Sequence, residues 1–204
     1  MTAEIRHIVY DIGQVLVHYD PLIPFKRIIP DEEKRSWFFA EVCTGAWNHE
    51  QDRGRAWAEA EAEAIARHPD EADNIRAFRA HWEEMIPYCY EDSVTLFRKL
   101  TASERDVTLL TNFAPDTFSI CRARYPFLEE SRGITVSGEV GMVKPDRDIF
   151  ERHAETFGLT PEATLFIDDK AVNIEGARSI GWHGIQFHDA AQLERDLAEH
   201  GIIV

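Results

Sequence analysis

A short apolar run near the N-terminus ends at a single carboxylate. Residues 8–10 are apolar, Asp11 follows them, and Gly13 comes two positions later. An apolar run of this kind is typical of a strand buried on both faces of a parallel sheet. The sequence therefore predicts a strand over residues 5–10 that presents Asp11 at its C-terminal edge, with Gly13 easing a tight turn beyond it. Alone, Asp11 has three interpretations: a nucleophile, a metal ligand or a turn former.

After residue 87 the sequence alternates between strand and helix character. We predict strands at residues 106–110, 133–137, 163–167 and 183–187, and helices at residues 92–100, 115–124, 146–157, 171–180 and 189–200. Strands that alternate with helices in this way are typical of a parallel sheet in a doubly wound α/β fold. Ligands of such folds bind at the carboxyl ends of the strands.

Residues 18–87 have a different character, with dense charge and helical periodicity. Residues 55–67 are rich in Ala and Glu, which favours a helix. A further helix is predicted from residue 69, where an amphipathic stripe recurs at Ile75, Phe78, Trp82 and Met85. We therefore predict a small all-helical domain over residues 18–87, inserted into an α/β core domain made of residues 1–17 and 88–204.

Polar residues stand at the ends of three predicted strands and in one further loop. They are Asp11, Thr111, Asn112, Asp168 and Asp169 at strand ends, and Lys144 in the loop of residues 141–145. Carboxylates that converge without partners are costly, so a hard cation is implied, and Mg²⁺ suits carboxylates together with water and a substrate phosphate. Because carboxylates form aspartyl-phosphate intermediates, the set predicts phosphoryl transfer with Asp11 as the nucleophile.

The other polar residues have both a functional and a plain interpretation. Thr111 and the amide of Asn112 are predicted to hold phosphate oxygens, and Lys144 is predicted to balance the charge of the phosphoryl group. The backbone carbonyl of Gly13 is expected to add an oxygen ligand to Mg²⁺. In the plain interpretation, Thr111 and Asn112 are helix caps and Lys144 is a solvated loop residue.

Four segments together resemble the motifs of the haloacid dehalogenase-like (HAD) hydrolase superfamily. These segments are residues 9–16, 109–112, 141–145 and 166–169, with Asn173 beyond the last. The resemblance implies a Rossmann-type core and a helical cap domain between the first and second motifs. It also implies a nucleophile and Mg²⁺ ligand at Asp11, phosphate binding at Thr111 and Asn112, stabilisation by Lys144, and a metal site completed by Asp168 and Asp169. Asn173 is expected to be a supporting helix residue.

The sequence departs from this family pattern at Gly13. Typical phosphatases of the superfamily carry a second aspartate there, which protonates the leaving group and then activates water. Gly13 transfers no proton, and general acid–base catalysis is typically worth ~10²–10⁴-fold. The substrate can have a good leaving group, as in a similar bacterial branch with Asp-x-Gly that includes sugar-1-phosphate phosphatases. Alternatively the cap donates an acid, for which His49 and His18 are candidates, or the chemistry is not that of a phosphatase.

A second family of the superfamily keeps this last alternative open. The 2-haloacid dehalogenases share the fold and the nucleophilic aspartate, lack the second aspartate and need no metal, but neutral polar residues replace the acids of their fourth motif. Here Asp168 and Asp169 would oppose a carboxylate substrate. We therefore expect a Mg²⁺-dependent phosphohydrolase of a small phosphorylated metabolite, such as a sugar phosphate. The alternatives are a dehalogenase with an ester intermediate on Asp11, or a catalytically weak member that binds a phosphorylated ligand or a protein.

The helical segment is expected to choose the substrate. Trp47, His49, Asp52, Arg53 and Arg55 cluster in a stretch predicted to be a loop. We predict that Trp47 and Arg53 contact the substrate. The plain interpretations are an apolar core position for Trp47 and a salt bridge for Arg53.

Composition limits the partners and the location. The net charge of −15 disfavours nucleic acid and anionic lipid as partners. The three cysteines match no zinc or redox motif, so we expect reduced thiols in a cytoplasm. We also expect no signal peptide, and no apolar run reaches the ~18 residues of a membrane span. The predicted protein is thus a cytoplasmic monomer or homodimer that acts on a small substrate.

Overall fold

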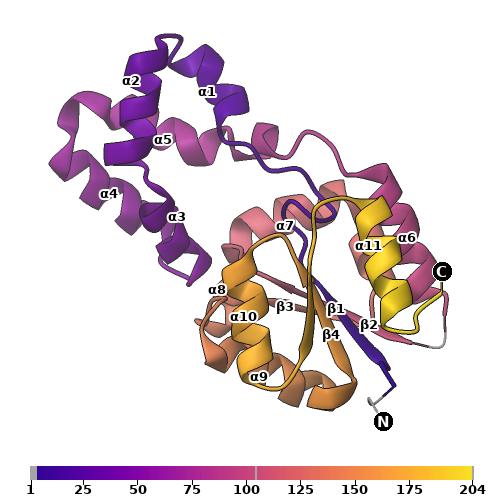
Figure 1. Ribbon diagram of the computed structural model, residues 1–204. Coiled ribbons are helices and arrows are strands. Elements are labelled where there is room, and N and C mark those ends of the chain that lie inside the picture. Colours follow the sequence, from indigo (N-terminus) through magenta and orange to yellow (C-terminus); the bar gives the residue numbers. More distant parts are fainter. Residues whose placement is uncertain (1–3, 104, 204) are drawn as a thin grey trace.

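The centre of the protein is a five-stranded parallel sheet. In the computed structural model, which describes residues 4–103 and 105–203, the strand order is β3-β2-β1-β4-β5 (Figure 1). The strands are β1 (His7–Tyr10), β2 (Asp106–Thr111), β3 (Ile134–Val136), β4 (Thr164–Asp168) and β5 (His183–Gln186). The predicted doubly wound α/β fold is confirmed. Because the chain moves outward from β1 to β3 and then crosses back to β4, β1 and β4 flank the switch point at which such folds bind ligands.

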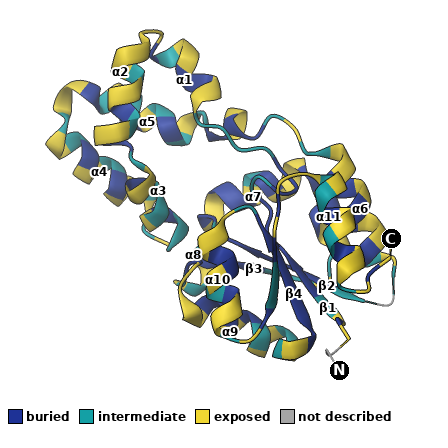
Figure 2. Ribbon diagram, viewed as in Figure 1, coloured by how far each residue is buried: buried dark blue, intermediate teal, exposed yellow. Residues whose placement is uncertain are grey.

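Helices cover both faces of this sheet (Figure 2). The core helices are α6 (Glu91–Thr101), α7 (Pro115–Arg124), α8 (Ser137–Val140), α9 (Arg147–Phe157), α10 (Ala171–Ser179) and α11 (Ala190–Glu199), with short 3₁₀ turns η4 (Pro126–Glu130) and η5 (Pro161–Ala163). Ile8 and Tyr10 of β1 share one apolar cluster with α6, α7 and α11. Val9, on the other face, shares a second cluster with α9 and α10. Burial on both faces explains why the strand centres are apolar at successive positions.

Between β1 and β2 the chain leaves the sheet and forms a separate group of helices, at the upper left of Figure 1. This helical insertion contains α1 (Leu22–Ile28), α2 (Glu32–Trp37), the π-helical turn η1 (Phe38–Val42), α3 (Gly45–Asp52), α4 (Trp57–Arg67), η2 (Pro69–Glu71), α5 (Ala72–Ala80) and η3 (Trp82–Met85). The predicted apolar stripe is buried, but its last two members lie in the 3₁₀ turn η3. Buried side chains of the insertion continue into the first apolar cluster of the sheet. The domain limits of residues 18–87 therefore stay a prediction.

The insertion begins and ends at neighbouring points of the core. Val17, on the outgoing chain, forms an antiparallel bridge with Cys89 on the returning chain. The Tyr90 N–H donates to the Leu16 carbonyl at 2.9 Å, beside this bridge. The two connections are therefore tied to each other as well as to the sheet.

The stretch that contains Trp47, His49 and Asp52 is helical, so the predicted loop is wrong. These residues lie in α3, and Thr44 caps the helix by accepting a hydrogen bond from the Trp47 N–H at 3.0 Å. Only Trp47 and Gln51 are buried along this helix. The apolar periodicity of this segment is therefore too weak to predict a helix from the sequence. A threonine at position 44 is nevertheless a typical N-cap residue and indicates where a helix could begin.

The tight turn after β1 does not depend on Gly13 in the way the sequence predicts. The left-handed residue is Gln14, with φ of 58°, whereas Gly13 lies outside that region. The Gln14 side chain holds this conformation, because its carbonyl accepts from the Tyr90 hydroxyl at 2.8 Å and its amide donates to the Tyr19 carbonyl at 3.1 Å. A Cβ added at Gly13 would meet nothing within 4 Å. The structure therefore has room for a side chain at this position.

A buried histidine makes the stability of the fold depend on pH. His153 of α9 is fully buried, with Nε2 at 2.9 Å from the Thr108 hydroxyl and Nδ1 at 2.8 Å from the Thr135 hydroxyl. Burial, with a smaller contribution from Arg132, lowers the pKa of His153 to about 3. Between this pKa and the ordinary value of about 6.5, the unfolded chain binds a proton that the folded protein does not. Stability is therefore lost as the pH falls below the ordinary value.

We expect the His153→Gln variant to lose this part of the pH dependence. On lowering the pH from about 7.5 to about 5, the wild type should lose about 2 kcal/mol more of its unfolding free energy than the variant does. Urea unfolding at the two pH values measures the difference, and the exposed His188→Gln variant, which should behave as the wild type does, is the matched control. Equal pH dependence in all three proteins would contradict the prediction.

The remaining general features concern membranes and thiols. No helix among the described residues has the length and apolar character needed to cross a membrane. Cys43, Cys89 and Cys121 are all free thiols. Burial raises the pKa of the Cys43 and Cys121 thiols to about 12, so both are protonated at neutral pH.

Candidate active site

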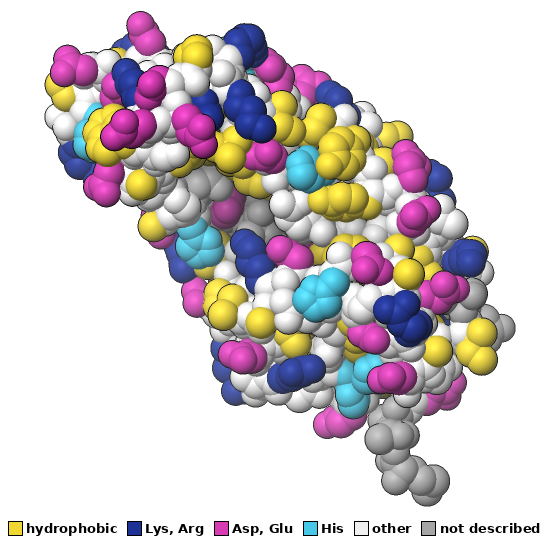
Figure 3. Space-filling view, turned by 45° about the horizontal axis from the view of Figure 1, so that its top comes forward, with side chains coloured by type: hydrophobic (Ala, Val, Ile, Leu, Met, Phe, Trp, Pro, Cys, Tyr) yellow, Lys and Arg dark blue, Asp and Glu magenta, His cyan; other side chains and the backbone are white. Residues whose placement is uncertain are grey.

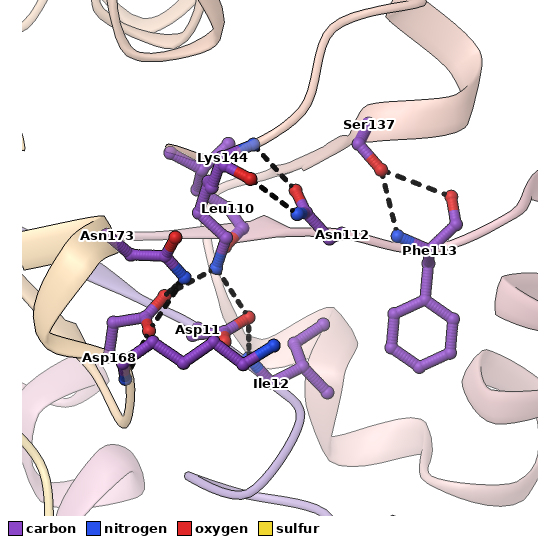
Figure 4. Close-up of polar contacts among 10 residues, drawn as sticks. Asp11, Ile12, Leu110, Asn112, Phe113, Ser137, Lys144, Asp168 and Asn173 are labelled. Atoms are coloured by element: carbon purple, nitrogen blue, oxygen red, sulfur yellow. Dashed lines mark hydrogen bonds and ion pairs between the residues drawn. The ribbon is translucent and has the colours of Figure 1, made fainter. Parts of the chain in front are cut away.

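Asp11 lies directly after β1, at the carboxyl edge of the sheet (Figure 4). Its Oδ1 accepts a hydrogen bond from the Ile12 N–H at 2.7 Å and lies 2.8 Å from Nζ of Lys144. No donor among the described residues reaches Oδ2. Burial raises the pKa of Asp11 to about 7, against the opposing effect of Lys144, and Asp168 adds to the increase. The carboxylate is thus fixed by one oxygen and available through the other.

Lys144 is buried between two carboxylates. Its Nζ lies 2.8 Å from Oδ1 of Asp11, 2.7 Å from Oδ2 of Asp168 and 3.0 Å from the Leu110 carbonyl. An ammonium group has three N–H donors, so all three are engaged. Burial works to lower the pKa of Lys144, but Asp11 and Asp168 outweigh it and the pKa is raised. The interpretation of Lys144 as a solvated loop residue is therefore excluded, and the residue is a fixed positive charge behind Asp11.

Asn112 holds the loop that carries this lysine. Its Nδ2 donates to the Lys144 carbonyl and its Oδ1 accepts from the Lys144 N–H, both at 2.9 Å (Figure 4). These bonds link the end of β2 to the loop before α9, so the side chain of Asn112 positions Lys144. Its side chain is not a helix cap. Thr111, the last residue of β2, is buried and lines the same cavity as Asp11.

Asp168 and Asp169 differ in how their oxygens are used. Both oxygens of Asp168 accept from Nδ2 of Asn173 at 2.9 Å; Oδ1 also accepts from the Lys170 N–H and Oδ2 from Lys144. Burial works to raise the pKa of Asp168, but Lys144 and these bonds outweigh it and the pKa is lowered. Asp168 is therefore saturated, and it holds Lys144 and Asn173 in place.

Asp169 lines the cavity, and its charge is poorly compensated. Burial, with the neighbouring charge of Asp168, raises the pKa of Asp169. One carboxylate oxygen from each of Asp11, Asp168 and Asp169 lies within 4.8 Å of the others. Asp11 and Asp168 share the ammonium group of Lys144, and Lys170 partly offsets the charge of Asp169, so three clustered carboxylates face two ammonium groups. Oxygen is the ligand that Mg²⁺ takes in proteins. The residues therefore fit a hard divalent cation, with Asp169 better placed than Asp168 to bind it directly.

The helical insertion lines one side of an open cavity over Asp11. The volume of this cavity is about 160 Å³. The core contributes Asp11, Gly13, Thr111, Asn112, Lys144, Asp169, Lys170 and Asn173, and the insertion contributes Asn48, His49, Asp52, Trp57 and Trp82. Figure 3 shows the surface hollowed between the lobe of the insertion and the rest of the molecule. The predicted core residues thus meet at one cavity, apart from Asp168, which lies behind it.

The two predicted substrate contacts of the insertion do not line this cavity. Trp47 packs in the core of the insertion against Trp57, and its indole N–H donates to the Ala60 carbonyl at 3.3 Å. Arg53 forms an ion pair with Asp146 at 3.0 Å. The structure therefore favours the plain interpretations of Trp47 and Arg53 over substrate contact. In the helix α3 the side chain of Trp47 is buried, and Arg53 is the C-cap residue. The predicted loop gave no basis for either position.

Of the two histidines considered as general acids, only one lines the cavity. His18 stacks on Tyr88 with ring centroids 4.6 Å apart, its Nδ1 lies 2.9 Å from the Tyr90 hydroxyl, and it does not line the cavity. His49 does line it. Sequence reasoning missed the cavity positions of Asp52 and Lys170. The adjacency of Lys170 to the acidic pair was its one visible signal.

A family profile matches most of the chain. The profile of haloacid dehalogenase-like hydrolases matches residues 5–181. The protein belongs to this family of hydrolases. Among curated relatives, a flavin mononucleotide hydrolase of Arabidopsis thaliana is 29% identical over 118 residues, which cover 57% of this chain and 48% of that protein. The chain spans about half the length of the curated relatives that it matches.

Solved structures share the whole fold at low identity. A HAD-family enzyme of Bacteroides thetaiotaomicron, in complex with magnesium and inorganic phosphate, has a TM-score of 0.70 at 23% identity, covering 93% of this chain and 98% of that chain. An L-2-haloacid dehalogenase of Xanthobacter autotrophicus, with chloropropionic acid covalently bound, has a TM-score of 0.65 at 18% identity, covering 98% and 85%. The fold is therefore shared with an enzyme structure that holds magnesium and inorganic phosphate and with a haloacid dehalogenase.

Proposed function

We propose that the protein is a Mg²⁺-dependent phosphohydrolase that acts on a small phosphomonoester through an aspartyl-phosphate intermediate on Asp11. The observation that carries this proposal is the arrangement of Asp11. One of its oxygens is held by Lys144 and the Ile12 N–H, the other accepts no hydrogen bond from the described residues, and both lie beside an acidic pair at a cavity that the helical insertion also lines.

Each residue has a role in the proposed reaction. Oδ2 of Asp11 attacks phosphorus while Lys144 and the Ile12 N–H hold Oδ1. Thr111 holds phosphate oxygens together with the backbone of Asn112. Asp11, Asp169 and the Gly13 carbonyl would hold Mg²⁺, and Asp168 supports them through Lys144 and Asn173. When bound, the cation would neutralise the charge of the phosphoryl oxygens.

The relatives and the size of the cavity support this proposal. The Arabidopsis relative is named a hydrolase of flavin mononucleotide, and the similar structure from Bacteroides holds magnesium and inorganic phosphate. The cavity of about 160 Å³ is below the ~300–1,000 Å³ typical of ligand pockets. A small phosphorylated metabolite, of which a sugar phosphate is one example, therefore suits this cavity.

The dehalogenase is the second candidate, because its fold is shared. Its substrate carries a carboxylate, which would enter a cavity where burial and Asp168 already raise the pKa of Asp169. The single ammonium of Lys144 is fully engaged by Asp11, Asp168 and a backbone carbonyl, so it has no donor left for a substrate carboxylate. Lys170 also lines the cavity, but it lies beside Asp52 and Asp169, whose charges it offsets. This charge balance favours phosphate with a divalent cation over a metal-free carboxylate substrate.

We expect the two chemistries to separate in one assay. With Mg²⁺, p-nitrophenyl phosphate should be hydrolysed, EDTA should abolish the reaction, and excess Mg²⁺ should restore it, because the carboxylates bind phosphate only when a cation compensates them. The measurement is phosphate release, compared with halide release from 2-chloropropionate under the same conditions. Halide release that resists EDTA, without phosphate release, would establish the dehalogenase. Turnover of neither substrate would favour a binding protein.

Other expectations from the sequence stay predictions. These are a cytoplasmic location, a monomeric or homodimeric state, and the absence of nucleic acid and membrane partners. The net charge of −15 supports only the last of these, because it repels nucleic acid and anionic lipid.

A further inference from the structure

The structure suggests which residue transfers the proton that Gly13 cannot, an inference that rests on the proposed phosphohydrolase function. The titratable side chains at the cavity, besides Asp11 and Asp169, are Tyr19, His49, Asp52, Lys144 and Lys170. The donors of Lys144 are all engaged. Burial raises the pKa of the Tyr19 hydroxyl far above neutrality, so it does not ionise there. His49, Asp52 and Lys170 remain.

Asp52 is fixed against the core by its own backbone. It is the last residue of α3, and its carbonyl accepts a hydrogen bond from the Ser137 hydroxyl of α8 at 2.6 Å. Two residues later Gly54, with φ of 106°, passes so close to α8 that a Cβ there would lie 2.8 Å from the Gly138 carbonyl oxygen. The end of α3 is therefore seated on the core, and the carboxyl of Asp52 is held over the cavity that contains Asp11.

The charges that face Asp52 leave it able to give and take a proton near neutral pH. Burial raises the pKa of Asp52 to about 7, Lys170 and the Ala114 N–H work to lower it, Asp11 raises it, and Lys144 lowers it slightly. Tyr19 and His49 are its other titratable neighbours at the cavity. A catalytic acid is most effective when its pKa lies near the working pH.

The other two candidates are less suited. Burial and the charge of Arg53 lower the pKa of His49, so its imidazole is neutral and carries no extra proton at neutral pH. Lys170 is a cation beside Asp52 and Asp169, and it balances part of their charge.

We propose that Asp52, supplied by the helical insertion, is the general acid and base of the reaction, in place of the carboxylate that Gly13 lacks. In the first step Oδ2 of Asp11 bonds to phosphorus, the bond from phosphorus to the leaving oxygen breaks, and that oxygen takes the proton of Asp52. In the second step ionised Asp52 takes a proton from water, whose oxygen bonds to phosphorus while the bond to Asp11 breaks. The products are an alcohol and inorganic phosphate, and both carboxyl groups return to their first state.

The test compares two leaving groups in the Asp52→Asn variant. Benzyl phosphate leaves as a basic alkoxide that needs a proton, whereas p-nitrophenolate leaves without one. We expect kcat/KM for benzyl phosphate to fall by ~10²–10⁴-fold, and kcat/KM for p-nitrophenyl phosphate by less than ~10-fold. The wild-type kcat/KM for benzyl phosphate should decline as the pH rises through about 7, because protonated Asp52 is then lost, and the variant should lack this decline.

Two further variants make the result specific. Glu50→Gln removes an exposed carboxylate from the same helix, outside the cavity, and should leave both substrates unaffected. Gly13→Asp has room for its side chain, and in the Asp52→Asn background it should recover at least ~10-fold of the benzyl phosphate activity, because it places a carboxyl group beside the same leaving oxygen.

The outcomes distinguish this inference from the proposed function. Equal losses on both substrates, without recovery by Gly13→Asp, would show that Asp52 only supports the site and would overturn the inference. No loss on benzyl phosphate would also overturn it, while the phosphohydrolase itself stands. If the wild type with Mg²⁺ hydrolyses neither ester, the proposed function fails and the inference fails with it.

Discussion

Asp11→Asn is expected to abolish turnover, lowering kcat by ~10⁴-fold or more, because an amide does not replace a carboxylate as the nucleophile. The substitution preserves the shape of the side chain, and its oxygen still accepts from the Ile12 N–H and Lys144. The fold should therefore be kept, and the thermal midpoint should stay close to that of the wild type. Phosphate release from p-nitrophenyl phosphate with Mg²⁺ measures the rate.

The covalent intermediate gives this prediction a second readout. Rapid acid quenching of the wild type with ³²P-labelled substrate should trap label on the protein, and Asp11→Asn should trap none. Asp70→Asn, an exposed aspartate of the insertion, serves as the control and should behave as the wild type does. A variant of Asp11 that keeps the wild-type rate would show that another group attacks the substrate.

Lys144→Met should have the largest effect on stability. It leaves Asp11 and Asp168 buried without the ammonium that now lies 2.8 and 2.7 Å from them. Removing one partner of a buried ion pair costs about 3–5 kcal/mol, because the remaining charge stays unpaired. Urea unfolding at neutral pH in EDTA should show a loss of this size, and turnover should be lost as well.

Mg²⁺ should partly reverse this loss of stability. A cation bound only by the folded state stabilises that state by mass action. In the variant the carboxylates of Asp11 and Asp168 lack the lysine, so the site attracts the cation more strongly. Lys99→Met, which removes an exposed lysine of α6, should change the unfolding free energy by no more than about 0.5 kcal/mol. A Lys144→Met protein as stable as the wild type would mean that the buried carboxylates are neutralised by other means.

The sheet and the core half of the site were predictable from the sequence. The predicted strands at residues 106–110 and 163–167 differ from β2 and β4 by one residue at their ends. The agreement is close because a strand buried on both faces is a continuous apolar run whose limits are visible in the sequence. Polar residues placed after such strands must meet at one edge. Asp11, Thr111 and Asp169 accordingly line one cavity.

The insertion half of the site was not predictable in the same way. The orientation of α3 depends on contacts with Ser137 and Asp146, which are distant in the sequence. These contacts produce no apolar periodicity in residues 45–54 from which the orientation could be predicted. The same limit applies to Asn112, whose partner is the backbone of a loop contributed after β3. The role of Gly13 was misjudged for a local reason, since Gln14 takes the left-handed conformation with help from Tyr90.

The bridge between Val17 and Cys89 has a consequence for the changes in length that the protein tolerates. The outgoing and returning chains are tied together at this bridge. The stability of the sheet therefore depends on this contact and only weakly on the length of chain between the two ends. Doubling the length of a flexible connection costs only about 0.6 kcal/mol. Residues can therefore be added to the flexible connections of the insertion at little cost to the sheet, whereas the buried side chains that the insertion shares with the first apolar cluster are constrained.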